Sequence, residues 1–325
     1  MAEPKVSVII PTYNQRDFVR ETIDSVLAQT YNNIEIIVTD DGSIDGTREI
    51  IQEYASQYPE KIKPVYSEKN TGIAANINRG LAVRTGEFIA WLGGDDIMLP
   101  EKIQKQVDLL IGRPDAVGCC HDAEVFESDT GKKLGLFSEL YNGKRGFTEG
   151  GVELWFRASY RMLPSSVMIR SALCPAHGFD ERLKYMNDWL FDVEVFRRGT
   201  CAVINEVLVK YRRHASNITA NPAARGQTLE ETLIVLGIVM ARYPELHRYV
   251  KQRRISAFLA AAAKAYSRGD LLKFKEYIKI LLKEGVLIRT IGMYLGLRVF
   301  GKYVSQEINN LPHERYRWLK KLMSI

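Results

Sequence analysis

The first 120 residues alternate between short β-rich runs and helical segments, and this alternation constrains the fold more than any other feature of the chain. Apolar strands are predicted at Val6–Ile10, Ile34–Thr39, Ile62–Tyr66, Phe88–Leu92 and Ala116–Cys120. Helical periodicity is predicted between them, near residues 17–29, 47–57, 73–83 and 100–111. Strands that alternate with helices through short loops are typical of an α/β fold with a parallel sheet and right-handed crossovers.

Polar residues follow three of these strands directly, at the point where each strand ends. They form the segments Pro11-Thr12-Tyr13-Asn14, Asp40-Asp41-Gly42-Ser43-Ile44-Asp45-Gly46-Thr47 and Gly93-Gly94-Asp95-Asp96. In an open α/β sheet the carboxyl ends of parallel strands meet at one crevice, where ligands bind. The sequence therefore predicts a single site formed by these three segments.

The adjacent acids Asp95 and Asp96 can be interpreted in two ways. Taken alone, they could form a solvated acidic turn. Two carboxylates at a strand end also repel each other unless a cation lies beside them, and oxygen ligands suit Mg²⁺ or Mn²⁺ with open positions for substrate phosphates. The convergence of the strand ends favours the metal site.

Composition and motif spacing exclude several classes of protein. The chain has 325 residues and the composition of a globular protein, with four cysteines, no Cys-x-x-Cys pair and therefore no zinc signal. No apolar run approaches the ~20 residues of a membrane span, and no signal peptide is expected, which predicts a cytoplasmic location. No Gly-x-Gly-x-x-Gly follows the first strand and no P-loop is present, which argues against dinucleotide oxidoreductases and P-loop NTPases.

Four motifs appear in a characteristic order along the chain. They are Pro11-Thr12-Tyr13-Asn14, Asp40-Asp41-Gly42-Ser43-Ile44-Asp45-Gly46-Thr47, Asn70-x-Gly72 with Asn78-x-Gly80, and Leu92-x-x-Asp95-Asp96. In this order they resemble glycosyltransferase family 2, whose members are inverting enzymes that use nucleotide sugars. The resemblance runs from about Val6 to Asn217. It implies a GT-A fold, a Rossmann-like mixed sheet flanked by helices.

The same resemblance implies a domain organisation and a set of donor contacts. Residues 1–220 would form the catalytic domain, with about 1–122 as the nucleotide-binding half and about 123–220 as the acceptor-binding half. Tyr13 would flank the base, Asp41 would hydrogen-bond a pyrimidine, and Asp95 would bind a metal that bridges the phosphates, with Asp96 and His214 beside it. The donor nucleotide would be contacted by Pro11, Thr12, Tyr13, Asn14, Asp41, Asn70, Gly72, Asn78, Gly94 and Asp95.

Two positions depart from the family pattern. Gly93 stands where the family usually has a further Asp, so fewer carboxylates are expected in this loop. Ile77 stands where an Arg is common, which removes an expected charged contact from the helix over residues 73–83.

A second set of motifs lies between residues 178 and 217. Gly178-Phe179-Asp180-Glu181 leads to Asn187-Asp188-Trp189, which resembles the family's GFDE and Glu-Asp segments with Asn187 in place of Glu. This implies that Asp188 is the catalytic base that deprotonates the acceptor hydroxyl; alternatively, Asp188 is only a helix N-cap. His214 matches the family's Tyr-Arg-x-His, where the His closes over the diphosphate or metal, although a lone His is more often structural.

Residues 221–325 change in character and are predicted to be helical. Helices are expected near 230–243, 246–268, 271–283 and 287–304. Most of the chain's net charge of +6 lies after Val286, where the sequence has seven Lys and Arg residues and two Glu residues. The rest of the chain is close to neutral, so nucleic acid is not expected as a partner. These segments suit either an amphipathic region on an anionic membrane surface, at the inner face of the cell membrane, or an ordinary packing domain.

The predicted function is an inverting, metal-dependent glycosyltransferase. It would move a sugar from a nucleotide-sugar donor, with UDP-sugars favoured, to a hydroxyl of a glycan or lipid-linked acceptor in cell-surface polysaccharide synthesis. The cofactor would be Mg²⁺ or Mn²⁺. Two alternatives remain, a nucleotidyltransferase that makes a nucleotide sugar and a catalytically idle nucleotide-binding protein on the same fold.

Overall fold

The computed structural model describes residues 3–157, 161–217 and 224–286, and the chain divides into two compact units at Met240. Helix α7 (Ala224–Arg242) begins in the first unit. There Glu231 accepts hydrogen bonds of 3.0, 2.7 and 2.9 Å from the backbone N–H groups of residues 184–186. This carboxylate ties the start of α7 to the segment that carries Asp188.

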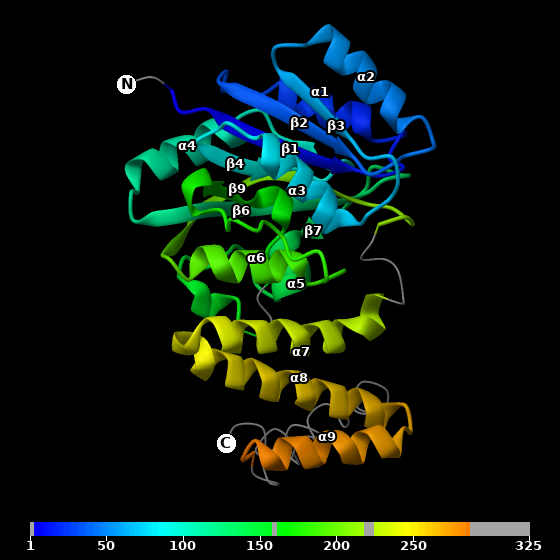
Figure 1. Ribbon diagram of the computed structural model, residues 1–325, viewed down its shortest axis with the longest axis vertical. Coiled ribbons are helices and arrows are strands. Elements are labelled where there is room, and N and C mark those ends of the chain that lie inside the picture. The colour runs from blue at the N-terminus through cyan, green and yellow to red at the C-terminus, as the bar shows by residue number, and fades with distance from the viewer. Residues whose placement is uncertain (1–2, 158–160, 218–223, 287–325) are drawn as a thin grey trace, which may run out of the picture. The chain divides into compact units, whose positions relative to one another are not determined.

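Within the described residues, the first unit is built on one nine-stranded sheet of order β3-β2-β1-β4-β8-β6-β9-β5, with β7 paired to β6 (Figure 1). The strands are β1 Val6–Thr12, β2 Ile34–Asp40, β3 Ile62–Tyr66, β4 Phe88–Trp91, β5 Ile97–Met98, β6 Ala116–Glu127, β7 Lys133–Leu136, β8 Met168–Arg170 and β9 Thr200–Arg213.

The sheet is mixed, and the parallel sheet predicted from the alternation is correct for only part of it. Strands β3, β2, β1 and β4 are parallel, whereas β8 runs antiparallel to both β4 and β6. The reason is that β8 arrives from a long connection after β7 and is inserted between β4 and β6. The mixed GT-A sheet implied by the family resemblance is confirmed.

Helices cover both faces of this sheet (Figure 1). They are α1 Val19–Leu27, α2 Thr47–Gln57, α3 Ile73–Val83, α4 Lys102–Gly112, α5 Phe137–Asn142 and α6 Asn187–Phe196. Alternate residues of β1, such as Val8 and Ile10, share a core with α1, α2 and α4. On the opposite face Gly80 of α3 lies so close to the sheet that a Cβ would be 2.8 Å from the Ile9 side chain. Successive apolar residues of β1 point to opposite faces of the sheet, and helices cover both faces.

The second unit contains a helical hairpin of α8 (His247–Ser267) and α9 (Leu271–Lys283), as predicted. Gly269 makes the turn with a φ of +74°, and Asp270 caps α9 by accepting a 3.1 Å hydrogen bond from the backbone N–H of Lys273. The helix predicted at 287–304 and the basic end lie outside the described residues. None of the helices within the described ranges is both long enough and apolar enough to cross a membrane.

Candidate active site

The ends of β1, β2 and β4 lie at one edge of the sheet, because these strands are parallel neighbours. Thr12 pairs with Asp40, and Ile9 pairs with Trp91. The three polar segments that follow these strands therefore start side by side, as the sequence predicted.

The Pro11–Asn14 segment is held by its own polar groups. The hydroxyl of Thr12 donates to the carbonyl of Thr39 at 3.0 Å. Asn14 has a left-handed φ of 50°, its Oδ1 accepts from the N–H of Ile44 at 3.0 Å, and its N–H donates to the Ser43 hydroxyl at 2.8 Å. Thr12 and Asn14 thus build the loop, while the ring of Tyr13 is 44% exposed and can meet a ligand.

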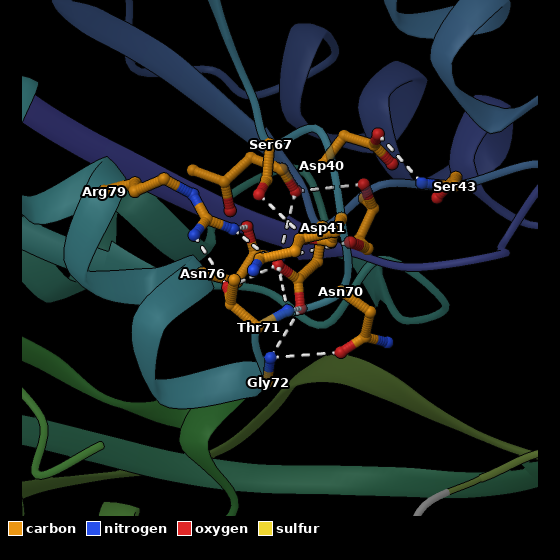
Figure 2. A network of polar contacts seen from close by, with 12 residues as sticks. Asp40, Asp41, Ser43, Ser67, Asn70, Thr71, Gly72, Asn76 and Arg79 are labelled. Carbon is orange, nitrogen blue, oxygen red and sulfur yellow. Dashed lines mark hydrogen bonds and ion pairs between the residues drawn. The ribbon is translucent and has the colours of Figure 1, made fainter.

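Asp41 lies at the centre of a polar network after β2 (Figure 2). Its side chain is 4% exposed and accepts hydrogen bonds from the N–H groups of Thr71 and Gly72 and from the Thr71 hydroxyl, at 2.8 to 3.1 Å. Asn70 supports the same turn, since its Oδ1 accepts from the Gly72 N–H at 3.1 Å. The predicted residues Asp41, Asn70 and Gly72 are therefore brought together.

Arg79 of α3 completes this network and was missed from the sequence. Its Nη2 lies 2.6 Å from Asp41 Oδ1, and its Nη1 donates to the Thr71 hydroxyl at 2.8 Å. A charged contact from α3 therefore exists, although the family's Arg position holds the buried Ile77. The Asn78-x-Gly80 motif, which brackets Arg79, was the only available signal.

Asn78, predicted to contact the donor, makes its hydrogen bonds to the acceptor half. Its Nδ2 donates to the Phe179 carbonyl at 2.9 Å and to Glu181 at 3.0 Å, and its Oδ1 accepts from the Phe179 N–H at 2.8 Å. The side chain of Asn78 therefore fixes the Gly178–Glu181 turn against α3.

Asp95 lies in the loop after β4 and meets the end of β9. Its Oδ2 lies 2.8 Å from Nε2 of His214 and 3.2 Å from Nδ2 of Asn217. On the other side of the ring, His214 Nδ1 lies 2.7 Å from the Ser216 hydroxyl, and the ring packs against Phe18 with centroids 4.5 Å apart. Asp95 and His214, which are far apart in sequence, are thus brought into contact.

Asp96 is buried beneath this contact. Its Oδ2 accepts from the Ser165 hydroxyl at 2.6 Å, and its Oδ1 accepts from the Arg212 N–H at 3.1 Å. Burial and the neighbouring Asp95 carboxylate raise the pKa of Asp96 well above its usual range. Both oxygens of Asp96 are thus engaged inside the fold, and its predicted place beside the metal stays a prediction.

Arg212, also missed from the sequence, locks the loop from β9. Its Nε donates to the Asp95 carbonyl at 2.8 Å, and its guanidinium pairs with Glu21. The guanidinium also stacks over Phe18 and Phe126, 5.1 and 4.8 Å from the ring centroids. Arg212 therefore places the loop that carries Asp95.

The two glycines of this loop allow close packing. A Cβ on Gly94 would lie 2.2 Å from the Gln15 side-chain oxygen and 2.8 Å from Thr12 Cγ2. The N–H of Gly93 donates to the Ser165 hydroxyl at 3.0 Å. Gly94 thus packs directly against Thr12 and Gln15, and a side chain at position 94 would not fit there.

Asp188 lies in the first turn of α6, and it is not the N-cap, which is Met186. Its Oδ1 accepts from the Trp189 N–H at 2.7 Å, and burial raises the pKa of Asp188 to about 6. One turn further, Asp192 accepts from the indole N–H of Trp155 at 3.2 Å, and burial with the nearby Asp188 raises the pKa of Asp192 to about 8. No ion pair to either carboxylate is found among the described residues.

An aromatic cluster connects α6 to the loop that carries Asp95. Phe191 packs edge-on against Trp91 with centroids 5.5 Å apart and stacks on Phe179 at 4.2 Å. Trp91 is the last residue of β4, immediately before the Leu92–Asp96 loop. Asp188 and Asp95 are therefore placed by elements that pack directly on one another.

Asp95 and His214 suit a divalent cation that also takes oxygens from a substrate. When the Nδ1 proton of His214 is donated to the Ser216 hydroxyl, Nε2 and Asp95 Oδ2 present two lone pairs 2.8 Å apart, which suits a cation that binds both. Across residues 3–157, 161–217 and 224–286, no three His, Cys, Asp or Glu side chains are grouped around one ion position. Mg²⁺ is commonly bound by one or two carboxylates plus substrate phosphates, so a two-ligand protein site fits this chemistry.

Comparison with known proteins gives the same family from sequence and the same fold from structure. Residues 7–173 match the model of glycosyl transferase family 2. An uncharacterized glycosyltransferase of Rickettsia prowazekii is 35% identical, with 98% of this chain and 97% of the relative covered.

Solved structures share this fold. Residues 1–349 of S. aureus TarS in complex with UDP-GlcNAc give a TM-score of 0.65 at 19% identity, with 90% of this chain and 85% of that chain covered. A mannosyltransferase from Pyrobaculum calidifontis in complex with GDP-Man and Mn²⁺ has a TM-score of 0.57 and 18% identity, with 92% and 87% covered. At these identities the likeness establishes the fold alone.

Proposed function

Because the chain belongs to glycosyltransferase family 2, we propose that it transfers a sugar, with inversion, from a nucleotide-sugar donor to a hydroxyl of a glycan or lipid-linked acceptor. The observation that carries the proposal is the contact of Asp95 with His214 at the strand ends, flanked by the Asp41 network and by α6 with Asp188. Membership of this family argues against the alternative function of a nucleotidyltransferase.

A uridine diphosphate sugar is the favoured donor. An ionised carboxylate accepts hydrogen bonds and cannot donate them, so Asp41 suits a base with an N–H on its pairing edge. Uracil presents such an N–H, whereas cytosine presents a lone pair at the same position. The complex of TarS with UDP-GlcNAc supports this choice. Guanine also presents an N–H, and the mannosyltransferase was solved with GDP-Man, so a guanosine donor is the second candidate.

Mg²⁺ or Mn²⁺ would be held by Asp95 and His214. The bound cation would supply charge neutralisation for the departing diphosphate. Asn217 and Ser216 orient these two ligands through the contacts described above, and Arg212 holds the backbone of the loop. Asp96 contributes by fixing the loop from inside. The Mn²⁺ complex of the mannosyltransferase supports a divalent ion.

Asp188 is the proposed base. With its pKa raised to about 6, the carboxylate is mostly ionised at neutral pH and remains basic enough to take a proton from an acceptor hydroxyl. Inversion requires the base and the leaving group on opposite sides of the anomeric carbon. Asp188 on α6 and Asp95 on the loop after β4 come from different elements on either side of the Trp91–Phe191 contact, which suits this arrangement.

Family membership supports a proposal for the acceptor and the cellular role. We propose synthesis of a cell-surface polysaccharide on the cytoplasmic side, with an acceptor that is a glycan or a lipid-linked saccharide. Peripheral contact with the membrane through the basic C-terminal segment remains part of the proposal, and it rests on the charge after Val286.

A ligand panel tests the proposal. Thermal unfolding is measured with UDP, GDP, dTDP, CMP and ADP, each with and without Mn²⁺. A ligand that binds only the folded state adds about 2.7 kcal/mol at a hundred times its Kd. We expect stabilisation by UDP that depends on Mn²⁺ in the wild type and not in Asp95→Ala. No stabilisation by any nucleotide would refute the proposed function.

A further inference from the structure

Arg79 is bound on several sides by polar groups of the donor half (Figure 2). Besides Asp41 and Thr71, its Nη2 donates to Oδ1 of Asn76 at 3.0 Å. Its Nε is buried and has no partner among the described residues. A buried donor without a partner is unfavourable, so the Nε group does not hold the guanidinium in place. Its position is set by the three side chains that its Nη atoms bind.

Asn76 anchors this guanidinium to the strand ends. The Asn76 side chain is buried, and its Nδ2 donates to the carbonyls of Thr12 and Thr39 at 3.1 and 3.2 Å. These carbonyls belong to β1 and β2, the strands that end in the Tyr13 and Asp41 segments. Arg79 is thus connected through one side chain to the ends of β1 and β2.

The Asp41 carboxylate has no spare capacity for a ligand in this arrangement. Five contacts of 3.1 Å or less reach its two oxygens, from Thr71, Gly72 and Arg79. A carboxylate offers about four lone-pair sites. A nucleobase N–H can therefore bind Asp41 only if one of these donors withdraws.

The donors differ in how readily they can withdraw. The Thr71 N–H is shared between both oxygens, at 3.1 and 3.0 Å, and Thr71 and Gly72 lie on an exposed turn. The Arg79 contact is the shortest of the five at 2.6 Å and is charge-assisted, and such bonds are the strong ones. Exchange should therefore occur at Thr71, while Arg79 keeps the carboxylate in place.

We propose that Arg79 determines the base preference of the donor site, as a positioning residue that acts through Asp41. It orients one carboxylate oxygen, and a base that presents an N–H can take the place of a Thr71 donor at that carboxylate. A base that presents a lone pair at this position cannot donate to the carboxylate, so its binding is not strengthened by the exchange. The inference rests on the proposed function, because it assumes that the nucleotide of the donor binds at Asp41.

The test compares UDP with CDP, since the two differ only at the pairing edge of the base. Kd values for both are measured by calorimetric titration with Mn²⁺ on wild type, R79Q, R79K and R20Q. Arg20 is the matched control, because it also pairs with a carboxylate, Glu53, but on the exposed face of α1 and α2. We expect wild type and R20Q to prefer UDP. R79Q should weaken UDP about tenfold with CDP changed less than twofold, and R79K should also lose preference because it lacks the planar fork.

Each outcome has a defined meaning. Equal weakening of UDP and CDP in R79Q, with a lowered melting temperature of the ligand-free chain, would make Arg79 a purely structural residue and overturn the inference. A wild type that binds both nucleotides without preference would overturn the inference and leave the proposed function standing. A wild type that binds neither would refute the proposed function and the inference together. If R79Q does not fold, R79K takes its place: a loss of the UDP preference in R79K would support the inference, and equal weakening of UDP and CDP would overturn it.

Discussion

Replacement of Asp188 by Asn tests the proposed chemistry most directly. A pKa near 6 means that roughly nine-tenths of the Asp188 carboxyls are ionised at pH 7 and roughly one-tenth at pH 5. If Asp188 is the base, the rate of the wild type should fall by nearly tenfold between these pH values. The carboxylate itself should be worth about 10² to 10⁴ in rate, as is typical of general bases, so Asp188→Asn should lose that factor at pH 7.

The assay is release of UDP from the sugar nucleotide that binds best, followed from pH 4.5 to 9 in the presence of Mn²⁺. Slow hydrolysis of the donor is sufficient, since a base that activates an acceptor hydroxyl also activates water. Nucleotide affinity of Asp188→Asn should equal that of the wild type, because Asp188 lies on α6 rather than in the Asp41 network.

Asp192→Asn is the matched control on the same helix. The Asp192 carboxyl, with a pKa raised to about 8, is mostly protonated at neutral pH, and Asn mimics that form. The fall in rate on the acid side of the pH profile, centred near pH 6, should therefore persist in Asp192→Asn. Glu231 faces Asp188 and Cys201 faces Asp192, and both remain in this variant. An acid limb that persists in Asp188→Asn, or that lies near pH 4 in the wild type, would refute Asp188 as the base.

Three further predictions concern the metal site and the core. Asp95→Ala should lose Mn²⁺-dependent nucleotide binding by calorimetry; unchanged metal dependence would remove Asp95 from the site. Ser165→Ala should lower the free energy of unfolding by about 1–3 kcal/mol, because Asp96 loses a buried partner, and urea titration measures it. Burial lowers the pKa of Lys102 from 10.5 to about 7, so the charged form of this group destabilises the folded chain, and that effect fades as the pH rises through these values. Lys102→Met should add at most about 5 kcal/mol at pH 6, and its advantage over the wild type should shrink as the pH rises towards about 10; a destabilised variant would contradict the reasoning.

The fold of the nucleotide half was predictable from the sequence because its interactions are local and periodic. Strands β1 to β4 are short apolar runs, and their ends were correctly placed at one edge of the sheet. The position of β8 was not predictable from alternation, since a three-residue strand (Met168–Arg170) carries too little pattern and its direction depends on a long connection. Only the resemblance to a known family implied the mixed sheet.

The candidate site was predicted in its residues and less well in its contacts. Asp41 and Asp95 were found because they lie in ordered motifs at strand ends. Their partners Arg79 and Arg212 were not found, because each reaches its carboxylate or loop through the packing of a separate element. The contacts of Asp96 were not predicted for the same reason, since its partner Ser165 lies far along the chain.

The glycine at position 93 fits a loop in which the Asp95 side chain is partly accessible and Asp96 is buried. A Cβ on Gly93 would lie 2.8 Å from Asp95 Oδ1 and 3.2 Å from Asp96 Oδ2, so a third acid would crowd both carboxylates in this loop conformation. Instead, the Ser165 hydroxyl accepts from the Gly93 N–H and donates to Asp96. His214, which directly follows β9, lies 2.8 Å from Asp95 and is the proposed second ligand for a cation. Because the site is shared between two segments, metal binding should stabilise the attachment of the β9 end to this loop.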